Sequence, residues 1–322
     1  MNRYLSIALA LAIAGLVIGG CGDDETTEPV CDLTVTGLYV NASTGNDLTG
    51  TGCPRRPLKT ITRALELAEP GYTVHVAPGT YDSVLGEVFP LTIEDSITVV
   101  GDNWETCVIS GRGDNASSDY NEAVTMSGES SALRRFTLEQ GGGEGEPWHL
   151  AIYVMYWATG ALVDSIRIFD RGDFSVLRIQ GARDCVVSSC RFTPTGAVVG
   201  RGFEVCSNDS GTVIRNCTVT GFSAALFFNY KSNAAVEGCV LEGNGLAAEL
   251  CCTQYEDSEP NPDFGGGSRG SAGGNIIRNN EECGLYNDTP NEVFAKYNTW
   301  ENDPPVEGTD FCNVGGGSVT WH

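Results

Sequence analysis

The densest run of ionisable side chains lies between residues 167 and 173. It consists of Arg167, Asp170, Arg171 and Asp173. Two carboxyl groups beside two guanidinium groups could serve as general acid and base at a glycosidic bond, which glycoside hydrolases cleave with paired carboxyl groups. The same composition is typical of a turn held by salt bridges, and we favour this structural role for the ionic cluster.

Aromatic side chains offer a second kind of chemistry, the stacking of flat rings on sugars. They gather at 148–157, after a glycine-rich segment, and again at 227–230. Alternation along strands would place Tyr153, Glu204 and Phe227 on one outer face, although some of these rings must belong to a core. The candidates for carbohydrate binding are Tyr153, Trp157, Glu204, Phe227, Tyr230 and Lys231.

Residues suited to metal binding are sparse. The three histidines, His75, His149 and His322, lie far apart, and there is no C-x-x-C motif, so a zinc site is not expected. Acidic turns at 46–47 and 114–115 could bind Ca²⁺ through oxygen ligands, but tight turns require the same residue types. We therefore expect no metal or other cofactor, with Ca²⁺ at these turns as the alternative.

The first residues have the pattern of an export signal. Asn2-Arg3 precedes an apolar run at 5–20, which is shorter than the roughly 20 residues of a membrane span and typical of a signal peptide. The run ends in Ile-Gly-Gly-Cys21, which resembles the lipobox of bacterial lipoproteins. That resemblance implies cleavage before Cys21 and lipidation of its side chain.

We expect three segments: a signal peptide at 1–20, an acidic tether at 21–32 and one folded domain at 33–322. Residue 22 is Gly rather than Asp, which favours the outer membrane over retention at the inner membrane. The expected location is the bacterial cell envelope, lipid-anchored, with the domain periplasmic or surface-exposed. An ordinary cleaved signal or an uncleaved anchor is the alternative.

Setting Cys21 aside leaves an even number of cysteines, twelve of the 13 in the chain. Outside the cytoplasm such cysteines are structural, and many form disulfides. Cys190, Cys217 and Cys239 recur at one position of a repeat, where neighbouring coils would place their Cα atoms about 4.8 Å apart. Either disulfides or a stack of buried thiols fits that spacing. Cysteines 31, 53 and 312 could join the ends of the domain.

Composition excludes some classes of function. The chain carries 19 Lys and Arg against 42 Asp and Glu, a formal net charge of −23, and a surface this negative repels nucleic acids. With 41 Gly and much Val, Thr, Ser and Asn, the chain is poorly suited to helices. We therefore expect a turn-rich all-β protein that does not bind nucleic acid.

A repeat of short strands supplies the scaffold for these side chains. Its frame fits 133–138, 163–168, 187–192, 214–219 and 236–241, and its fourth positions are spaced by 30, 24, 27 and 22 residues. Stacked strands at this spacing, with alternate side chains pointing inward, predict the coils of a parallel β-helix. A second column runs through 152–154, 203–205 and 226–228, with its register around Arg178 left open.

One helix precedes the repeat. Residues 60–68 place Ile61, Ala64 and Leu65 on one face, and we expect this helix to cap the first coil, because an open strand edge invites aggregation. An ordinary surface helix is the alternative. A strand at 73–76 is followed by Ala77–Tyr81, which we predict to be a turn.

Residues 38–101 resemble the N-terminal module of pectin-lyase-like right-handed β-helix lipoproteins that are described as a domain of unknown function. The residues that carry this resemblance are Tyr39-Val40, Gly45-Asn46-Asp47, 57–61, Ala64-Leu65, 71–81 and Phe89-Pro90-Leu91. Segments at 275–280, 284–285 and 298–300 resemble the closing coils of such proteins. The resemblance implies an all-β, single-stranded right-handed parallel β-helix with a short N-terminal capping helix, and no assigned reaction.

Many β-helix proteins degrade polysaccharides, but their sequence motifs are absent here. The set Asn-Thr-Asp, Asp-Asp, Gly-His-Gly and Arg-Ile-Lys of polygalacturonases is incomplete, as are the Trp-x-Asp-His and Arg-x-Pro-x-x-Arg signatures of pectate lyases. We therefore expect a non-catalytic envelope lipoprotein that binds polysaccharide or acts as a surface scaffold. The alternative is a polysaccharide lyase or glycoside hydrolase that acts on the face of Tyr153, Glu204 and Phe227.

Overall fold

The structure is a computed structural model. It describes residues 36–111, 113, 121–139, 149–170, 174–196, 200–207, 210–251 and 259–322, with the side chains of His149 and Asp170 left out. These residues all belong to a compact unit that spans Val35–His322. None of the helices in these ranges has the length and apolar character that a membrane span requires. Cys21 and the predicted signal peptide and tether lie outside the described residues.

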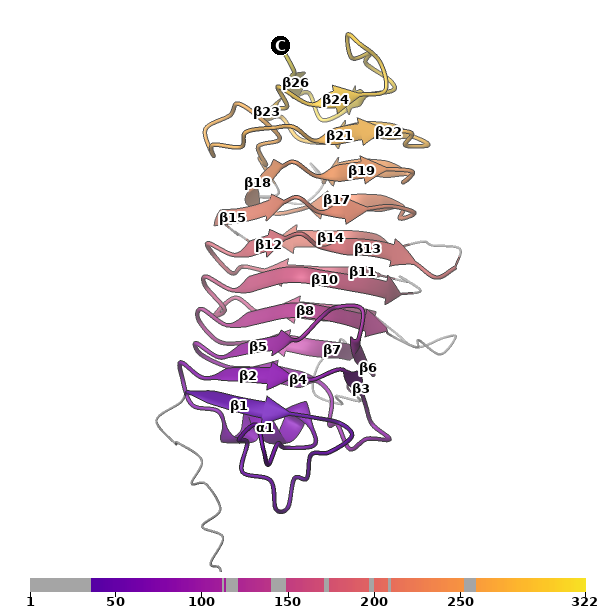
Figure 1. The fold of residues 1–322 in the computed structure, drawn as a ribbon. Coiled ribbons are helices and arrows are strands. Elements are labelled where there is room, and N and C mark those ends of the chain that lie inside the picture. Colours follow the sequence, from indigo (N-terminus) through magenta and orange to yellow (C-terminus); the bar gives the residue numbers. More distant parts are fainter. Residues whose placement is uncertain are drawn as a thin grey trace, which may run out of the picture. The chain divides into compact units, whose positions relative to one another are not determined.

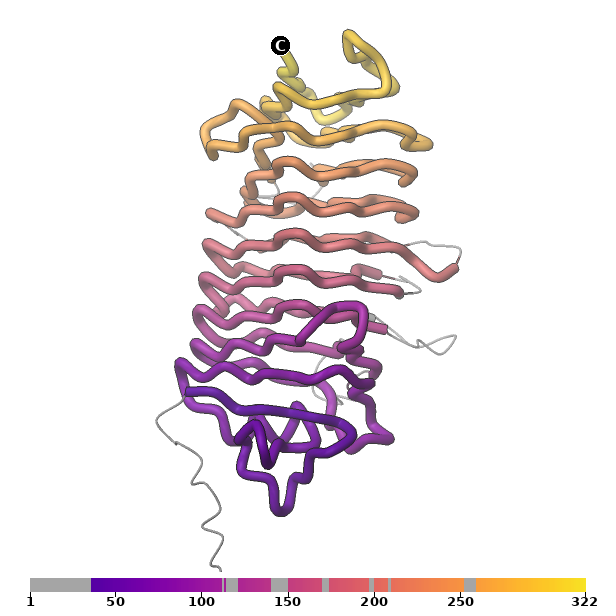
Figure 2. The backbone as a smooth tube through the Cα atoms, in the orientation of Figure 1, coloured from indigo at the N-terminus to yellow at the C-terminus, as the bar shows by residue number. Residues whose placement is uncertain are grey.

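Within these ranges the strands pair in parallel and wind into stacked coils (Figures 1 and 2). A nine-stranded sheet consists of β4 (Leu91–Ile93), β7 (Asn121–Met126), β9 (His149–Val154), β11 (Ser175–Gln180), β14 (Arg201–Cys206), β17 (Ala224–Phe228), β20 (Leu246–Leu250), β22 (Cys283–Asn287) and β25 (Phe311–Asn313). A pair of short strands, β23 (Glu292–Phe294) and β26 (Ser318–Thr320), forms a separate sheet.

The remaining described strands form a fifteen-stranded sheet. Its main path is β1 (Gly37–Val40), β2 (Thr73–Val76), β5 (Thr98–Gly101), β8 (Ala132–Glu139), β10 (Leu162–Asp170), β13 (Arg191–Pro194), β16 (Thr218–Val219), β19 (Val240–Glu242), β21 (Ile276–Arg278) and β24 (Thr299–Trp300). Joined to this path are β3 (Gly79–Asp82), β6 (Cys107–Ser110), β12 (Val186–Ser188), β15 (Ser210–Arg215) and β18 (Asn233–Glu237).

The register confirms the repeat frame. Leu133, Val163, Val187, Ile214 and Val236 stand in one row of paired residues, and all of them are buried in the core. Because side chains alternate between the two faces of a strand, one apolar residue at a constant position of each coil builds a continuous interior row. The parallel β-helix predicted from this spacing is therefore confirmed.

A column of residues with left-handed backbone runs from coil to coil, two positions after this interior row; in β8 and β10 it lies within the strand. Arg135, Ser165, Ser189, Asn216 and Gly238 occupy equivalent positions and have φ between 54° and 61°. Such φ values suit Gly and Asn and strain other residues, and only Asn216 and Gly238 of this column follow that preference. This conformation redirects the chain so that the next residue points into the core.

The predicted helix is confirmed as α1 (Ile61–Leu67). Its N-cap Thr60 accepts a hydrogen bond from the Arg63 N–H at 3.0 Å, a standard way to satisfy the first turn of a helix. Ile61 and Ala64 are fully buried in the same apolar core as the strands. The helix thus covers the open end of the first coils, as predicted for a cap.

The predicted turn at 77–81 is wrong in its second half, where β3 begins at Gly79. This strand pairs with β6, so that Tyr81 lies opposite Ile109. The Tyr81 ring is fully buried and its hydroxyl donates to the Ala77 carbonyl at 2.8 Å. Pairing and burial, which depend on a segment almost 30 residues away, outweigh the local turn preference of Pro and Gly.

Of the two arrangements left open for Cys190, Cys217 and Cys239, the structure has the stack of buried thiols. A disulfide joins Cys283 and Cys312 near the last coils. Cys190, Cys217 and Cys239 instead carry free thiols, stacked from coil to coil and buried in the core. Hydrogen bonding to the Cys190 thiol, together with burial, raises the pKa of Cys217 well above its usual value. The Cys217 thiol therefore stays protonated at neutral pH.

A buried asparagine organises the last coils. Asn275 is fully buried and its amide group donates to the carbonyl oxygens of Val236 and Phe264, each at 3.0 Å, and to Asn298 Oδ1 at 2.9 Å. Its own side-chain oxygen accepts from the Cys239 N–H at 2.9 Å. One side chain thus satisfies backbone groups that have no strand partner at this turn.

Candidate functional site

The outward face of the nine-stranded sheet carries one row of side chains, which we call the outer ladder. It runs through Thr125, Tyr153, Arg178, Glu204, Phe227, Glu249 and Tyr286. The residues on either side of each member point into the core, as Leu177 and Ile179 do around Arg178. The predicted face of Tyr153, Glu204 and Phe227 thus exists, with Arg178 inserted between the first two. Sequence reasoning left this register open because β11 departs from the even repeat spacing.

The centre of the outer ladder is buried although it lies outside the main apolar core. Tyr153 and Arg178 are each 9% exposed, and Glu204 and Phe227 are each 3% exposed. A charged pair on the outer face of a sheet would ordinarily be solvated. The centre of the ladder is therefore a buried charged region on a face where solvated side chains are expected.

Glu204 has two defined neighbours. The Ser175 hydroxyl donates to one carboxylate oxygen at 2.8 Å, and the Arg178 guanidinium lies 4.0 Å from the other. β11 and β14 are in register, so Arg178 stands directly opposite Glu204. The charge of the carboxylate is thereby compensated, which is the condition for burying it.

The aromatic rings of the ladder are covered by cations and amides. The Arg201 guanidinium lies 3.3 Å from the centre of the Phe227 ring, a cation–π contact. The Tyr153 hydroxyl donates to Gln180 Oε1 at 2.6 Å. Neither ring presents an open face to solvent, so these two candidates do not offer a stacking platform in this arrangement.

A thiol at the edge of the ladder is held in its neutral form. Cys206 stands opposite Gln180 and is fully buried. Burial raises the pKa of its thiol to about 11, although the nearby Arg178 guanidinium opposes that shift. A protonated thiol is a poor nucleophile, so Cys206 does not supply the ladder with covalent chemistry.

Exposed aromatic side chains lie at the turn that follows the same strands. Continuing the strand register by one or two residues places Tyr156, Gly181, Ser207 and Tyr230 in one row, which we call the edge row. Tyr156 and Tyr230 are 49% and 43% exposed. Three coil steps separate them, about 14 Å at about 4.8 Å per step, and the two residues between them are small. The edge row therefore presents two rings with low side chains between them.

Further exposed groups adjoin the edge row. The Trp157 side chain is 57% exposed and its ring centre lies 3.5 Å from that of Tyr156. Arg183 and Lys231 are exposed on neighbouring turns. Of the six carbohydrate-binding candidates, Trp157, Tyr230 and Lys231 are thus exposed here, whereas Tyr153, Glu204 and Phe227 are buried in the outer ladder.

The ionic cluster lies only partly within the described residues. Arg171, Asp173 and the Asp170 side chain fall outside them. Arg167 lies 3.9 Å from the Glu105 carboxylate, and its guanidinium is 5.0 Å from the Trp104 ring centre. Arg167 therefore links its strand to the loop before β6, a contact that the sequence did not reveal because the two segments are more than 60 residues apart.

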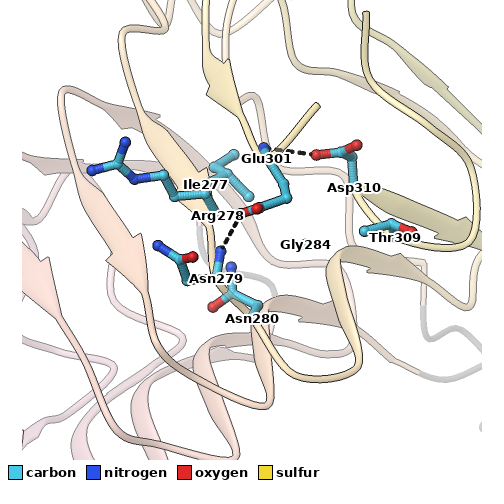
Figure 3. Close-up of a pocket in the computed structure, with 8 residues that line it drawn as sticks. All are labelled: Ile277, Arg278, Asn279, Asn280, Gly284, Glu301, Thr309 and Asp310. Atoms are coloured by element: carbon cyan, nitrogen blue, oxygen red, sulfur yellow. Dashed lines mark hydrogen bonds between the residues drawn. The ribbon is translucent and has the colours of Figure 1, made fainter. Parts of the chain in front are cut away.

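A pocket of about 190 Å³ lies near the last coils, lined by Ile277, Arg278, Asn279, Asn280, Gly284, Glu301, Thr309 and Asp310 (Figure 3). The two carboxylates in this pocket, Glu301 and Asp310, accept hydrogen bonds from backbone N–H groups. Glu301 accepts from the Asn279 N–H at 2.8 Å, and Asp310 accepts from the Glu301 N–H at 2.9 Å. Asp310 also accepts from the Val306 N–H at 2.8 Å. These carboxylates stabilise the closing loops by accepting hydrogen bonds from their backbone N–H groups.

The first of the two acidic turns considered for Ca²⁺ is used in the same way. Asp47 accepts hydrogen bonds from the N–H groups of Lys59 and Thr60, at 2.7 and 3.1 Å. The second turn, at 114–115, is not described. Across the ranges that the structure describes, no three His, Cys, Asp or Glu side chains are placed to hold a metal ion.

Stacked parallel coils with an interior apolar row and an outer ladder define the class of this protein. It is a right-handed parallel β-helix protein with a pectin-lyase-like fold. The model of the family described as “Protein of unknown function (DUF1565)” matches residues 43–142 and 253–307. This match confirms the resemblance predicted from the N-terminal module and from the closing coils. A search of curated proteins found no match.

Several solved structures share this fold. A rhamnogalacturonan lyase is 14% identical, with a TM-score of 0.56, over 88% of this chain and 84% of that one. Pectate lyase Pel9A is 15% identical, with a TM-score of 0.59, over 88% and 76% of the two chains. The GH136 lacto-N-biosidase from Eubacterium ramulus is 10% identical, with a TM-score of 0.52, over 88% and 67%. At these identities the comparisons show the fold.

Proposed function

We propose that this protein is a lipoprotein of the bacterial envelope that binds polysaccharide without cleaving it, through the edge row and Trp157. The observation that carries this proposal is the exposure of Tyr156, Trp157 and Tyr230, at 49%, 57% and 43%. Aromatic rings with one face in solvent and a cation nearby suit the apolar faces and hydroxyl groups of sugars. Solenoid flanks offer extended surfaces on which a polymer can lie along the axis.

The state of the outer ladder favours binding over catalysis. A general base must reach the proton that it removes, but Glu204 is 3% exposed and is engaged by Ser175 and Arg178. The Cys206 thiol, with a pKa of about 11, is protonated at neutral pH. The solved structures with the same fold include enzymes named for polysaccharide substrates, which supports a polysaccharide as the ligand class.

The binding proposal is tested with residues 22–322, which lack the predicted signal peptide and Cys21 and contain the whole compact unit. We call this form the soluble chain. Trp157→Ala and Tyr230→Ala should each weaken binding to a polysaccharide identified from a panel by about tenfold, because one ring–ligand contact of about 1.4 kcal/mol corresponds to that factor. Tyr297→Ala is the matched control, since Tyr297 is 73% exposed and also has positive φ, 65° against 50° at Tyr230. Equal effects of all three substitutions would contradict the proposal.

A second candidate function is a polysaccharide lyase or glycoside hydrolase that uses the outer ladder. The observation in its favour is the buried charged pair of Arg178 and Glu204 on a face outside the core. Incubation with uronate and neutral polysaccharides, followed by measurement of unsaturated and reducing-end products, separates the two functions. Product that disappears in Glu204→Gln would replace the binding proposal with the enzymatic one.

The lipid anchor is proposed from the sequence alone. The apolar run at 5–20 and the Ile-Gly-Gly-Cys21 motif support it. Labelled palmitate should appear in the wild-type chain and be absent from Cys21→Ser, and globomycin should block maturation of the wild type. Processing that is unchanged in Cys21→Ser would remove the lipoprotein assignment.

A further inference from the structure

Two loops meet at the beginning of α1 and expose three apolar side chains there. Leu48 is 95% exposed, Val84 is 92% exposed and Val88 is 66% exposed. Isolated exposed apolar residues are normal on a protein surface. Here, three exposed aliphatic side chains lie on loops around one end of a helix. Such a group is typical of a surface that binds a partner.

Hydrogen bonds show that the first loop belongs to this feature. Leu48 is flanked by Asp47, which accepts from the Lys59 and Thr60 N–H groups, and by Thr49, whose carbonyl accepts from Arg56 at 2.9 Å. Leu48 is thereby held next to the basic segment that leads into α1. The loop is fixed, so the exposure of Leu48 follows from its backbone position.

The second loop is tied to the same helix end. Glu87 accepts from the N–H groups of Ile61 and Thr62 at 2.6 and 2.8 Å, and the Val88 N–H donates to Thr62 Oγ1 at 2.9 Å. Val84 lies in the turn just before Glu87. Figure 1 shows α1 and the indigo loops around it at the end of the stack next to β1.

The segment that leads into α1 is basic, although Asp47 and Glu87 lie on the adjoining loops. Residues 55–63 contain Arg55, Arg56, Lys59 and Arg63 and no acidic residue, in a chain with only 19 basic residues against 42 acidic ones. Arg55 and Arg56 are exposed. We define the cap surface as Leu48, Val84 and Val88 together with Arg55, Arg56 and Lys59.

We infer that the cap surface docks on the lipid bilayer that holds the anchor. Apolar side chains flanked by cations are the combination that binds the headgroup region, where the aliphatic groups enter the acyl boundary and the cations meet anionic lipid. The inference rests on the proposed lipidation of Cys21. About fifteen residues separate Cys21 from the first described residue, so the tether reaches at most about 50 Å, and the cap surface is at the tethered end of the domain.

Docking in this orientation directs the coil stack away from the bilayer. The edge row then faces the solvent, where an extended polysaccharide can reach it. A docked cap surface would fix the axis of the β-helix relative to the membrane.

The three lysines of the chain provide an internal test. Lys59 belongs to the cap surface, Lys231 adjoins the edge row and Lys296 lies near the last coils. In the lipidated chain on vesicles of phosphatidylglycerol and phosphatidylethanolamine, amine-reactive labelling of Lys59 should slow by about fivefold or more relative to the soluble chain of residues 22–322, because interfacial groups lose access to water. Labelling of Lys231 and Lys296 should be unchanged.

A paired substitution tests the surface itself. Leu48→Asp with Val84→Asp should restore the labelling of Lys59 while palmitate incorporation and vesicle association persist. Val306→Asp with Val314→Asp is the matched control, because these valines are 47% and 54% exposed on the closing loops, and it should leave Lys59 protected.

The outcomes separate docking from anchoring. Absence of palmitate and of vesicle association would show that the proposed anchor fails, and docking with it. A lipidated, vesicle-bound chain whose Lys59 reacts as fast as in the soluble chain would overturn docking alone. Protection of Lys59 that rises with protein concentration in the soluble chain would overturn docking in favour of contact between two copies.

Discussion

The buried ion pair of Arg178 and Glu204 in the outer ladder tests how burial of charge affects the stability of this fold. Arg178→Met removes the guanidinium, keeps much of the side-chain volume, and leaves the Glu204 carboxylate 3% exposed with only the Ser175 hydroxyl beside it. Removing one partner of a buried pair ordinarily costs about 3–5 kcal/mol. Because the charges are 4.0 Å apart and the Ser175 hydrogen bond persists, we expect a loss at the lower end, about 3 kcal/mol.

The double variant Arg178→Met with Glu204→Gln separates the pair from the packing. Glutamine can still accept from Ser175 and carries no charge to bury, so we expect the double variant to lose less stability than Arg178→Met alone. The coupling between the two sites should be at least about 1 kcal/mol. Denaturant unfolding of the soluble chain, of its two single variants and of the double variant, followed by circular dichroism, measures this coupling.

An exposed ion pair on the other sheet is the matched control. Arg134 lies 3.2 Å from Asp164, closer than Arg178 lies to Glu204, but the Arg134 side chain is 45% exposed. Exposed pairs contribute below about 1 kcal/mol, so Arg134→Met should cost less than Arg178→Met despite the shorter distance. Equal costs at the two sites, or a cycle without coupling, would refute the argument that burial governs the outer ladder.

Three further predictions concern the core and the cap. Burial raises the pKa of Glu87, so the folded state holds this proton more tightly than the unfolded chain does. The free energy of unfolding of the wild type, relative to that of Glu87→Gln, should therefore fall as pH rises from about 4.5. If denaturant unfolding gave the two chains the same dependence of stability on pH, it would contradict this prediction. Cys217 should resist iodoacetamide in the native protein and react once urea unfolds it, as peptide mass spectrometry would show. Asn275→Ala should cost about 3 kcal/mol because it strands several buried polar groups, whereas Asn103→Ala, on an exposed loop, should cost under about 1 kcal/mol.

Much of the fold could be predicted because a solenoid repeats a local pattern. Leu133, Val163, Val187 and Ile214 occupy one position of successive coils, and that spacing alone predicted a stack of parallel strands, which the register confirms. The helix at 60–68 could be predicted for the same reason, since an amphipathic period and a Thr cap are local properties.

Other features escaped the sequence because they depend on contacts between distant segments. The β3 strand exists through its pairing with β6, and Arg167 finds Glu105 across more than 60 residues. Likewise, the register of Arg178 depends on the irregular length of the coil that contains β11. None of these contacts leaves a periodic trace in the sequence.

In the candidate site, too, some features could be predicted from the local sequence and others depend on contacts between distant segments. The sequence was enough to place Tyr153, Glu204 and Phe227 on one outward face, because side chains alternate between the two faces of any strand. Which rings are accessible depends on what covers them, and there Arg201 lies over Phe227 while Tyr156 and Tyr230 stay exposed.

The sequence by itself determined the parallel β-helix, its capping helix and the acidic composition, because repeat spacing and residue type act locally and coil by coil. It also predicts the lipid anchor at Cys21. Only the tertiary structure decided that the central charges of the outer ladder are buried, that the Cys217 stack remains as thiols, and that aliphatic and basic residues meet on the cap surface. Burial and pairing are properties of the assembled coils, and no single segment of the chain carries them.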